Sequence, residues 1–269
     1  MLASVCSKLS AARFPAVVIK SLDHWPDLGG DFDIHTVGSA DDIRKVMEQH
    51  FDATVQAQSW ADRLAGKWRF VIPALEKSIE IHLGGLGQAG QQARIGRLTL
   101  GRKITRTFGS HQLSVPSPED QILIRAIDRC YRHYSLRLCD IVDAAQVILG
   151  DPVDFDYVKC ESKRAGIRKG VCSYLSTVAG YYSHYAGEPL CLPAWVRKGA
   201  TFNVDKVYAH AGLFRIPLFP QGARLFRYEL SKAIRRKDVK KAVRTGLIPT
   251  LAIAAGARFR ITGRDKGIW

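Results

Sequence analysis

The feature that most constrains the fold is the stretch from Gly29 to His35, GGDFDIH, in which acidic and apolar residues alternate after a glycine pair. An extended chain places alternate side chains on opposite faces, so Asp31, Asp33 and His35 are expected to share one face of a strand. Two carboxylates this close repel each other. The stretch therefore predicts a strand whose polar face needs water, a cation or a proton.

A second stretch, from Ile79 to Leu83, repeats the pattern of an acid, an apolar residue and a histidine in Glu80-Ile81-His82. Carboxylate oxygens are the ligands that hard divalent cations prefer. The two stretches raise the question whether their strands meet around a metal ion. Surface histidines at strand ends are the commoner case for His35 and His82.

The rest of the first 112 residues predicts a small sheet domain. An apolar β-branched run at 16–19 indicates a buried strand, and alternation indicates further strands at 54–56, 68–72 and 79–83. Ser39 is positioned to cap a helix that follows the acidic strand. Short strands are also expected at 97–100 and 103–107.

The middle of the chain predicts helices only. Ser117 followed by Pro118 and two acidic residues is a typical helix start, and further helices are expected up to Gly150, over 154–166 and over 168–185. We predict an α+β protein with a small mixed-sheet domain at 1–112, a helical domain at 113–190 and a basic region at 191–269.

Charge is distributed unevenly along the chain. Between Arg197 and Trp269 there are 17 Lys and Arg against 4 Asp and Glu, which gives +13 of the total net charge of +15. Such an asymmetry favours contact with a polyanion. For the basic helix expected at about 224–244, a role as a partner-binding or solvated surface ranks first, an anionic membrane surface second and nucleic acid third.

The six cysteines are dispersed, without the spacing of a metal cage or a disulfide framework. Reduced thiols in a cytoplasmic protein fit this pattern best. The first residues lack the features of a signal peptide, and no apolar run reaches the roughly 18 residues that a membrane span needs.

The acidic stretch, the turn at Lys20-Ser21 before it and the third acid at Glu80 together resemble the nucleotidyltransferase-fold superfamily of the DNA polymerase β type. The helical part is similar to an uncharacterised bacterial nucleotidyltransferase-like family, through the segments at 118–123, 138–141 and 153–157 and through His133. The resemblance covers about residues 15–185.

The resemblance implies an enzyme that transfers a nucleotidyl group from an NTP such as ATP to a hydroxyl acceptor. Asp31, Asp33 and Glu80 would be the catalytic residues and would bind one or two Mg²⁺ ions. Nucleotide-binding residues are then expected in the two turns and in the segment 66–69, where a basic hairpin turn is an equally good interpretation of the cations: Lys20, Ser21, Gly29, Gly30, Lys67 and Arg69.

Three departures from the family pattern keep a second hypothesis open. The phosphate-binding turn is Lys20-Ser21 where the family has Gly-Gly, Gly-Ser or Lys-Gly, the third acid is Glu80 and not Asp, and histidines stand at 35 and 82. A non-catalytic nucleotide-sensing or scaffolding module is therefore the alternative. The segment 258–269 resembles the lead-in to a thymidylate-kinase-like domain, which makes a kinase-like protein the expected partner.

Overall fold

The computed structural model describes residues 1–23, 25, 30–202, 208–210, 213–218, 221–251 and 253–254. Gly29 and the segment 258–269, for which nucleotide binding and a kinase-like partner are expected, lie outside these residues. The chain forms two compact units, Met1–Gln121 and Ile122–Trp269. Both helices and strands build it, so the fold class is α+β, as predicted. The three-part division at residues 112 and 190 stays a prediction.

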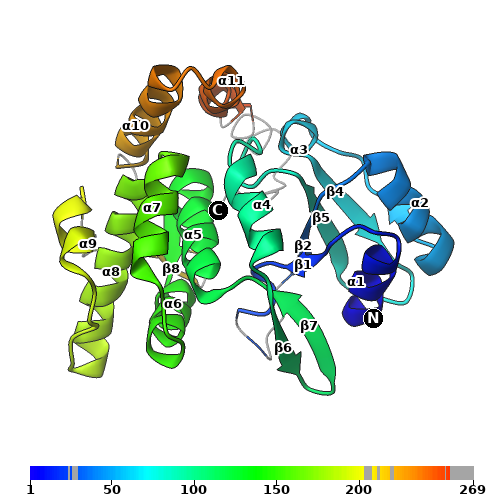
Figure 1. Ribbon diagram of the computed structural model, residues 1–269, viewed down its shortest axis with the longest axis horizontal. Helices are drawn as coiled ribbons and strands as arrows, with labels where there is room; N and C mark the ends of the chain where they lie inside the picture. Colours follow the sequence, from blue (N-terminus) through cyan, green and yellow to red (C-terminus); the bar gives the residue numbers. More distant parts are fainter. Residues whose placement is uncertain are drawn as a thin grey trace. The chain divides into compact units, whose positions relative to one another are not determined.

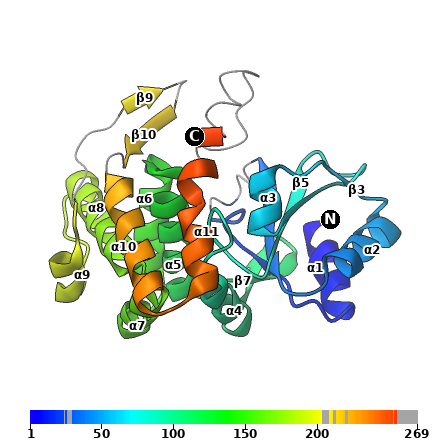
Figure 2. The same cartoon turned by 90° about the horizontal axis from the view of Figure 1, so that it is seen from above.

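The first unit begins with a helix and is built around a mixed sheet (Figures 1 and 2). In chain order its elements are α1 (Leu2–Ala11), β1 (Val17–Val18), β2 (Asp31–Thr36), α2 (Ala40–Phe51), β3 (Thr54–Val55), α3 (Trp60–Ala65), β4 (Lys67–Val71), β5 (Ser78–Leu83), α4 (Ala93–Gly101), β6 (Ile104–Phe108), β7 (His111–Val115) and the first part of α5 (Pro118–Asp128).

The sheet has the order β1-β2-β5-β4-β3. Only β2 and β5 run parallel within it; the pairs β1–β2, β4–β5 and β3–β4 are antiparallel. Alternation along the two central strands sends Phe32, Ile34, Ile79 and Ile81 into one apolar core. The opposite face of the same two strands therefore carries their polar side chains.

Helices α1 and α2 cover the apolar face of the sheet, as Figure 1 shows. Val5 and Leu9 of α1 and Ile43 and Met47 of α2 are buried at helical spacing. The start of α2 is the predicted one: the Ser39 hydroxyl accepts a hydrogen bond from the backbone N–H of Asp42. The amphipathic pattern after Ser39 thus places this helix on the sheet.

The strand expected at 97–100 is wrong, because these residues belong to α4. Ile95 and Thr99 of α4 are buried one helical turn apart, and the Thr99 hydroxyl donates to the carbonyl of Ile95. The strand expected at 103–107 is correct; β6 pairs with β7 as an antiparallel hairpin. A short run of alternating residues fits either structure, and packing against β2 decides for the helix.

The second unit is mostly helical. In chain order it contains the rest of α5, the π-helical turn η1 (Arg129–His133), β8 (Ser135–Arg137), α6 (Leu138–Gly150), α7 (Phe155–Ala165), α8 (Arg168–Ala186), α9 (Ala194–Gly199), β9 (Tyr208–His210), β10 (Leu213–Pro217), α10 (Gln221–Arg235) and α11 (Val239–Gly246). Helix α8 packs against α6, α7 and α9.

The middle of the chain is not all-helical, which corrects the prediction. β8 pairs with β10, and β10 pairs with β9, in a three-stranded antiparallel sheet. The partner of β8 lies some 80 residues further along the chain. Three residues have no clear alternation of their own, so only this distant pairing makes Ser135–Arg137 a strand.

The single basic helix expected at about 224–244 is also wrong, because two helices occupy this region. Lys237, between α10 and α11, has a φ of +55°, which a continuing helix does not allow. Asp238 then caps α11 by accepting from the backbone N–H of Lys241 at 3.0 Å. In the part of the chain that the structure describes, no helix is both long and apolar enough to cross a membrane.

Replacing Phe70 by alanine tests the core of the first unit. The Phe70 side chain is fully buried between the sheet and its helices, so Phe70→Ala is expected to lower the free energy of unfolding by about 3–5 kcal/mol. Urea unfolding followed by circular dichroism measures this. Trp60→Ala is the control, since Trp60 is 78% exposed, and it should change stability by less than about 0.5 kcal/mol. Equal losses in both variants would contradict the placement of Phe70.

Candidate functional site

The candidate site lies on the polar face of the central strands of the first unit. The parallel register of β2 and β5 sets Asp33 beside Glu80 and Asp31 beside Ser78. β4, on the other side of β5, sets Arg69 beside Glu80. Side chains of directly paired residues point to the same face. The three predicted acids, Asp31, Asp33 and Glu80, therefore share one surface, which we call the acidic face.

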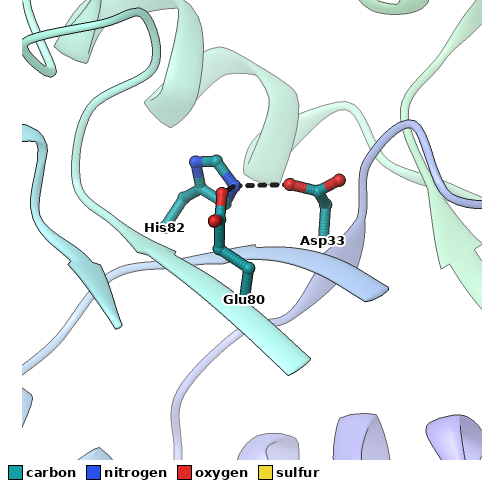
Figure 3. A group of neighbouring side chains, drawn as sticks. All are labelled: Asp33, Glu80 and His82. Carbon is teal, nitrogen blue, oxygen red and sulfur yellow. Dashed lines mark hydrogen bonds and ion pairs between the residues drawn. The ribbon is translucent and has the colours of Figure 1, made fainter. Parts of the chain in front are cut away.

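Asp33, Glu80 and His82 form the tightest group on this face (Figure 3). The His82 Nε2 atom lies 2.7 Å from Asp33 Oδ1 and 2.9 Å from Glu80 Oε1. One ligand atom from each residue lies within 4.8 Å of the others, a spacing that a single metal ion can span. Two carboxylates and an imidazole suit Mn²⁺ or Zn²⁺, while carboxylates alone suit Mg²⁺.

Basic side chains of β4 contact the same carboxylates. Lys67 Nζ lies 2.5 Å from Glu80 Oε1, and both side chains are almost fully buried. The Arg69 guanidinium bridges two acids, with Asp31 Oδ2 at 3.0 Å and Glu80 Oε2 at 3.3 Å. The other oxygen of Asp31 accepts a hydrogen bond from the Ser78 hydroxyl at 2.6 Å. Lys67 and Arg69, which were expected to bind the nucleotide, therefore contact the acids in this structure, and nucleotide binding by them stays a prediction.

The turn before the acidic strand contributes two side chains: Ser21 hydrogen-bonds to the backbone of β2, and Lys20 adds a further cation. The Ser21 hydroxyl accepts from the backbone N–H of Asp33 at 2.7 Å and donates to the carbonyl of Asp31 at 3.2 Å. Lys20 has a φ of +71°, in the left-handed region that favours glycine. This conformation brings its Nζ to 3.1 Å from Asp33 Oδ1. Lys20 thus places a positive charge beside Asp33.

The Asp33 carboxyl is ionised at neutral pH. Burial raises its pKa, but the Lys20 ammonium and the hydrogen bond and charge of His82 outweigh burial, so the pKa lies below the ordinary 3.8. Asp33 is therefore available as an anionic ligand.

His35 is completely buried and contacts the backbone of the site residue His82. Its Nδ1 atom donates to the backbone carbonyl of His82 at 3.1 Å. Burial, with the nearby charge of His82, lowers the pKa of His35 to about 4, so the imidazole is neutral at pH 7. Gly96 of α4 lies against the ring, and a Cβ atom there would be 2.8 Å from His35 Nε2. His35 is thus a packing residue and not a surface histidine.

Among the described residues, and apart from His82, the permanent charges on this face balance. Three carboxylates, Asp31, Asp33 and Glu80, face three permanent cations, Lys20, Lys67 and Arg69. A carboxylate that already has an ammonium partner binds a metal ion less readily, because one cation must displace the other. A divalent cation on this face therefore competes with the basic side chains for the same carboxylates.

Sequence patterns located most of this face but not all of it. Gly30 is exposed, and a Cβ atom there would meet nothing within 4 Å, so the protein itself does not require glycine at this position. Ser78 and Gly96 were missed. Ser78 stands on the same alternating face as Glu80 and His82, and that periodicity was the available signal. Gly96 carried no signal, since its role depends on the packing of α4 against β2.

Comparison with solved structures gives a likeness at low sequence identity. The chain resembles a solved structure of an antigenic nucleotidyltransferase-like protein from Paracoccidioides brasiliensis, with 13% sequence identity and a TM-score of 0.48, over 69% of this chain and 88% of that one. This likeness does not establish a family. No family model and no curated protein matches the sequence.

Removing one partner of the buried Lys67–Glu80 pair tests the electrostatics of the site. Lys67→Met is expected to lower the free energy of unfolding by about 3 kcal/mol, the lower end for breaking a buried ion pair, because Arg69 and His82 still contact Glu80. Urea unfolding measures the loss.

Combining Lys67→Met with Glu80→Gln should restore most of that stability, since no buried charge is then left without its ammonium. The matched control is Lys45→Met on α2, because the Lys45 side chain is 63% exposed. If the double variant is less stable than Lys67→Met, the two side chains do not act as a pair.

Proposed function

We propose that the protein is a metal-dependent nucleotidyltransferase of the DNA polymerase β type, which moves a nucleotidyl group from an NTP to a hydroxyl acceptor. The observation that supports this most is the parallel register of β2 and β5. It gathers Asp33, Glu80 and His82 so that three ligand atoms lie within 4.8 Å. Asp31 stands two residues before Asp33 on the same face, and its carboxylate would be a ligand for a second cation.

The residues present fit a divalent cation. Asp33 is ionised, its oxygen and that of Glu80 converge on His82 Nε2, and Asp31 adds a carboxylate beside them. Mg²⁺ or Mn²⁺ bound here would stabilise phosphate charge and lower the pKa of an attacking hydroxyl. Of the two, we propose that Mn²⁺ binds more tightly, because an imidazole nitrogen is among the ligands.

Lys67 and Arg69 are the residues that we propose bind the triphosphate. Both already form ion pairs with oxygen anions of the acidic face. Ammonium and guanidinium groups form strong charge-assisted hydrogen bonds with phosphate oxygens as well. When the two side chains turn to a triphosphate, a metal ion can take their place beside Glu80 and Asp31. Lys20 likewise turns from Asp33 to the triphosphate, so that Asp33 can bind the metal ion.

This exchange couples the two ligands. The permanent charges of the described residues on the acidic face balance before binding, so a divalent cation alone adds uncompensated positive charge to a partly buried site. A metal–nucleotide complex brings the compensating negative charge with it. We therefore propose that metal and nucleotide bind together, each raising the affinity of the other.

The second candidate is a non-catalytic nucleotide-sensing or scaffolding module that acts with a kinase-like partner. The specific observation in its favour is that Lys20, Lys67 and Arg69 of the chain itself occupy the carboxylates. Such a module would bind a metal–nucleotide complex and would not turn it over. Binding and turnover must therefore be measured separately.

Asp33→Asn is the variant that tests catalysis. It keeps the size of the side chain and removes the anionic ligand, so pyrophosphate release from NTPs should fall by more than about 100-fold. The assay supplies each common NTP with Mg²⁺ or Mn²⁺ and fractionated cell extract as the source of hydroxyl acceptors. Asp41→Asn on the exposed start of α2 is the control and should keep full activity. Unchanged turnover in Asp33→Asn would rule out the catalytic proposal.

Titration calorimetry tests the coupling between metal and nucleotide. Mn²⁺ is expected to bind at least about tenfold more tightly when a non-hydrolysable NTP analogue is present, because the analogue engages Lys67 and Arg69. Arg69→Gln should reduce this gain by removing one of the two cations, while Arg63→Gln on α3 should leave it unchanged. Equal affinity for Mn²⁺ with and without the analogue would contradict the proposed exchange of partners.

A further inference from the structure

Helices α10 and α11 of the second unit form a strongly basic surface that the nucleotidyltransferase proposal does not use. Residues 221–247 contain nine Lys and Arg against the two acids Glu229 and Asp238, a net charge of +7. Glu229 is buried, so it does not offset the charge of the surface. Most of the basic residues of the two helices are exposed: Arg224, Arg227, Arg235, Arg236, Lys237 and Lys240.

Two basic side chains fix this surface to the rest of the unit. Lys241 Nζ lies 3.4 Å from Glu229 Oε1 and also donates to the carbonyl of Ala165, at the end of α7. Arg236 donates to the carbonyls of Lys163 and Arg164 in the same last turn of α7. Cations at the carboxyl end of a helix also interact favourably with its dipole. The surface is thus held in one orientation on α7.

The outward side of α11 carries aliphatic side chains in place of polar ones. Val239, Val243 and Leu247 follow one another at intervals of four residues and so form one stripe. Val239 is 72% exposed and Val243 is 57% exposed. Thr245 and Ile248, on the other side, are buried. Ile234, near the end of α10, adds a fourth exposed aliphatic side chain beside the basic residues.

We propose that this basic-aliphatic surface, formed by α10 and α11, docks on an anionic phospholipid bilayer. Exposed aliphatic side chains with Lys and Arg around them are the composition of a helix that lies in a membrane interface. The aliphatic stripe enters the boundary between headgroups and acyl chains, and the basic residues contact lipid phosphates. The surface thus complements an anionic bilayer in two ways: its aliphatic stripe matches the acyl chains, and its positive charge matches the lipid phosphates.

The two other occupants fit the surface less well. Nucleic acid needs basic residues for its phosphates, but it gains nothing from a row of exposed valines. A second copy of the chain would bring the same positive charge against itself and would be repelled. Of these three occupants, only a lipid surface uses both the charge and the aliphatic stripe.

Vesicle flotation with the full-length protein tests the proposal. The protein is expected to float with vesicles of phosphatidylcholine and phosphatidylglycerol and to stay in solution with phosphatidylcholine alone. The variant V239S/V243S should lower the partition coefficient by at least about tenfold, since it removes the aliphatic stripe. The variant R235Q/K240Q should lower it by about 25-fold, at roughly fivefold for each basic residue removed.

Matched controls lie elsewhere on the surface. Leu149→Ser on α6 removes an exposed aliphatic residue, and Lys45→Gln on α2 removes an exposed cation; both should leave the partition coefficient unchanged. Thermal unfolding checks that each variant is folded. The substituted valines are exposed, so their loss is not expected to disturb the fold.

Three results would overturn the proposal. The first is equal flotation with neutral and anionic vesicles, and the second is undiminished flotation of V239S/V243S. The third is binding to a DNA duplex at physiological salt that exceeds binding to anionic vesicles, is lost in R235Q/K240Q and is kept in V239S/V243S. That last result would identify the surface as a nucleic-acid site.

Discussion

The parallel pairing of β2 with β5 is the interaction on which the first unit depends. Strands with a period of two residues have one face for a core and one for solvent or ligand, and the register Asp33–Glu80 aligns these faces across the two strands. The same register puts Phe32 beside Ile79 and Ile34 beside Ile81 under α1 and α2. A shift by one residue would place the carboxylates in that core, where an unpaired charge is very costly.

The acidic face is stable because the chain supplies its own counterions. Asp33 and Glu80 both contact a single imidazole nitrogen, so their two carboxylates lie close enough to repel each other strongly. Lys20 and Lys67, together with Arg69, offset that repulsion within the folded chain. The proposed function follows from the same balance: a ligand that carries both signs of charge, a metal–nucleotide complex, can exchange partners with the face and leave it neutral.

The second unit shows how far a local pattern specifies structure. Helices α7 and α8 follow their caps and periodicity, with Asp154 accepting from two backbone N–H groups at the start of α7. β8 does not follow from any local signal, since its partner β10 is distant in the chain. At Lys237 a continuous amphipathic run is divided into α10 and α11, and no glycine or proline stands there to indicate the end of a helix.

The sequence by itself determined the α+β class, the helix start at Ser39, and the placement of Asp31 and Asp33 on one face of a strand and of Glu80 on a face of another, because caps and two-residue periodicity are local properties. Only the tertiary structure decided which side chains neutralise those acids. The positive φ of Lys20, the position of β4 beside β5 and the contact of Gly96 with His35 depend on pairing and packing between distant segments. No pattern within one segment specifies such contacts, because their energies arise only when the segments meet.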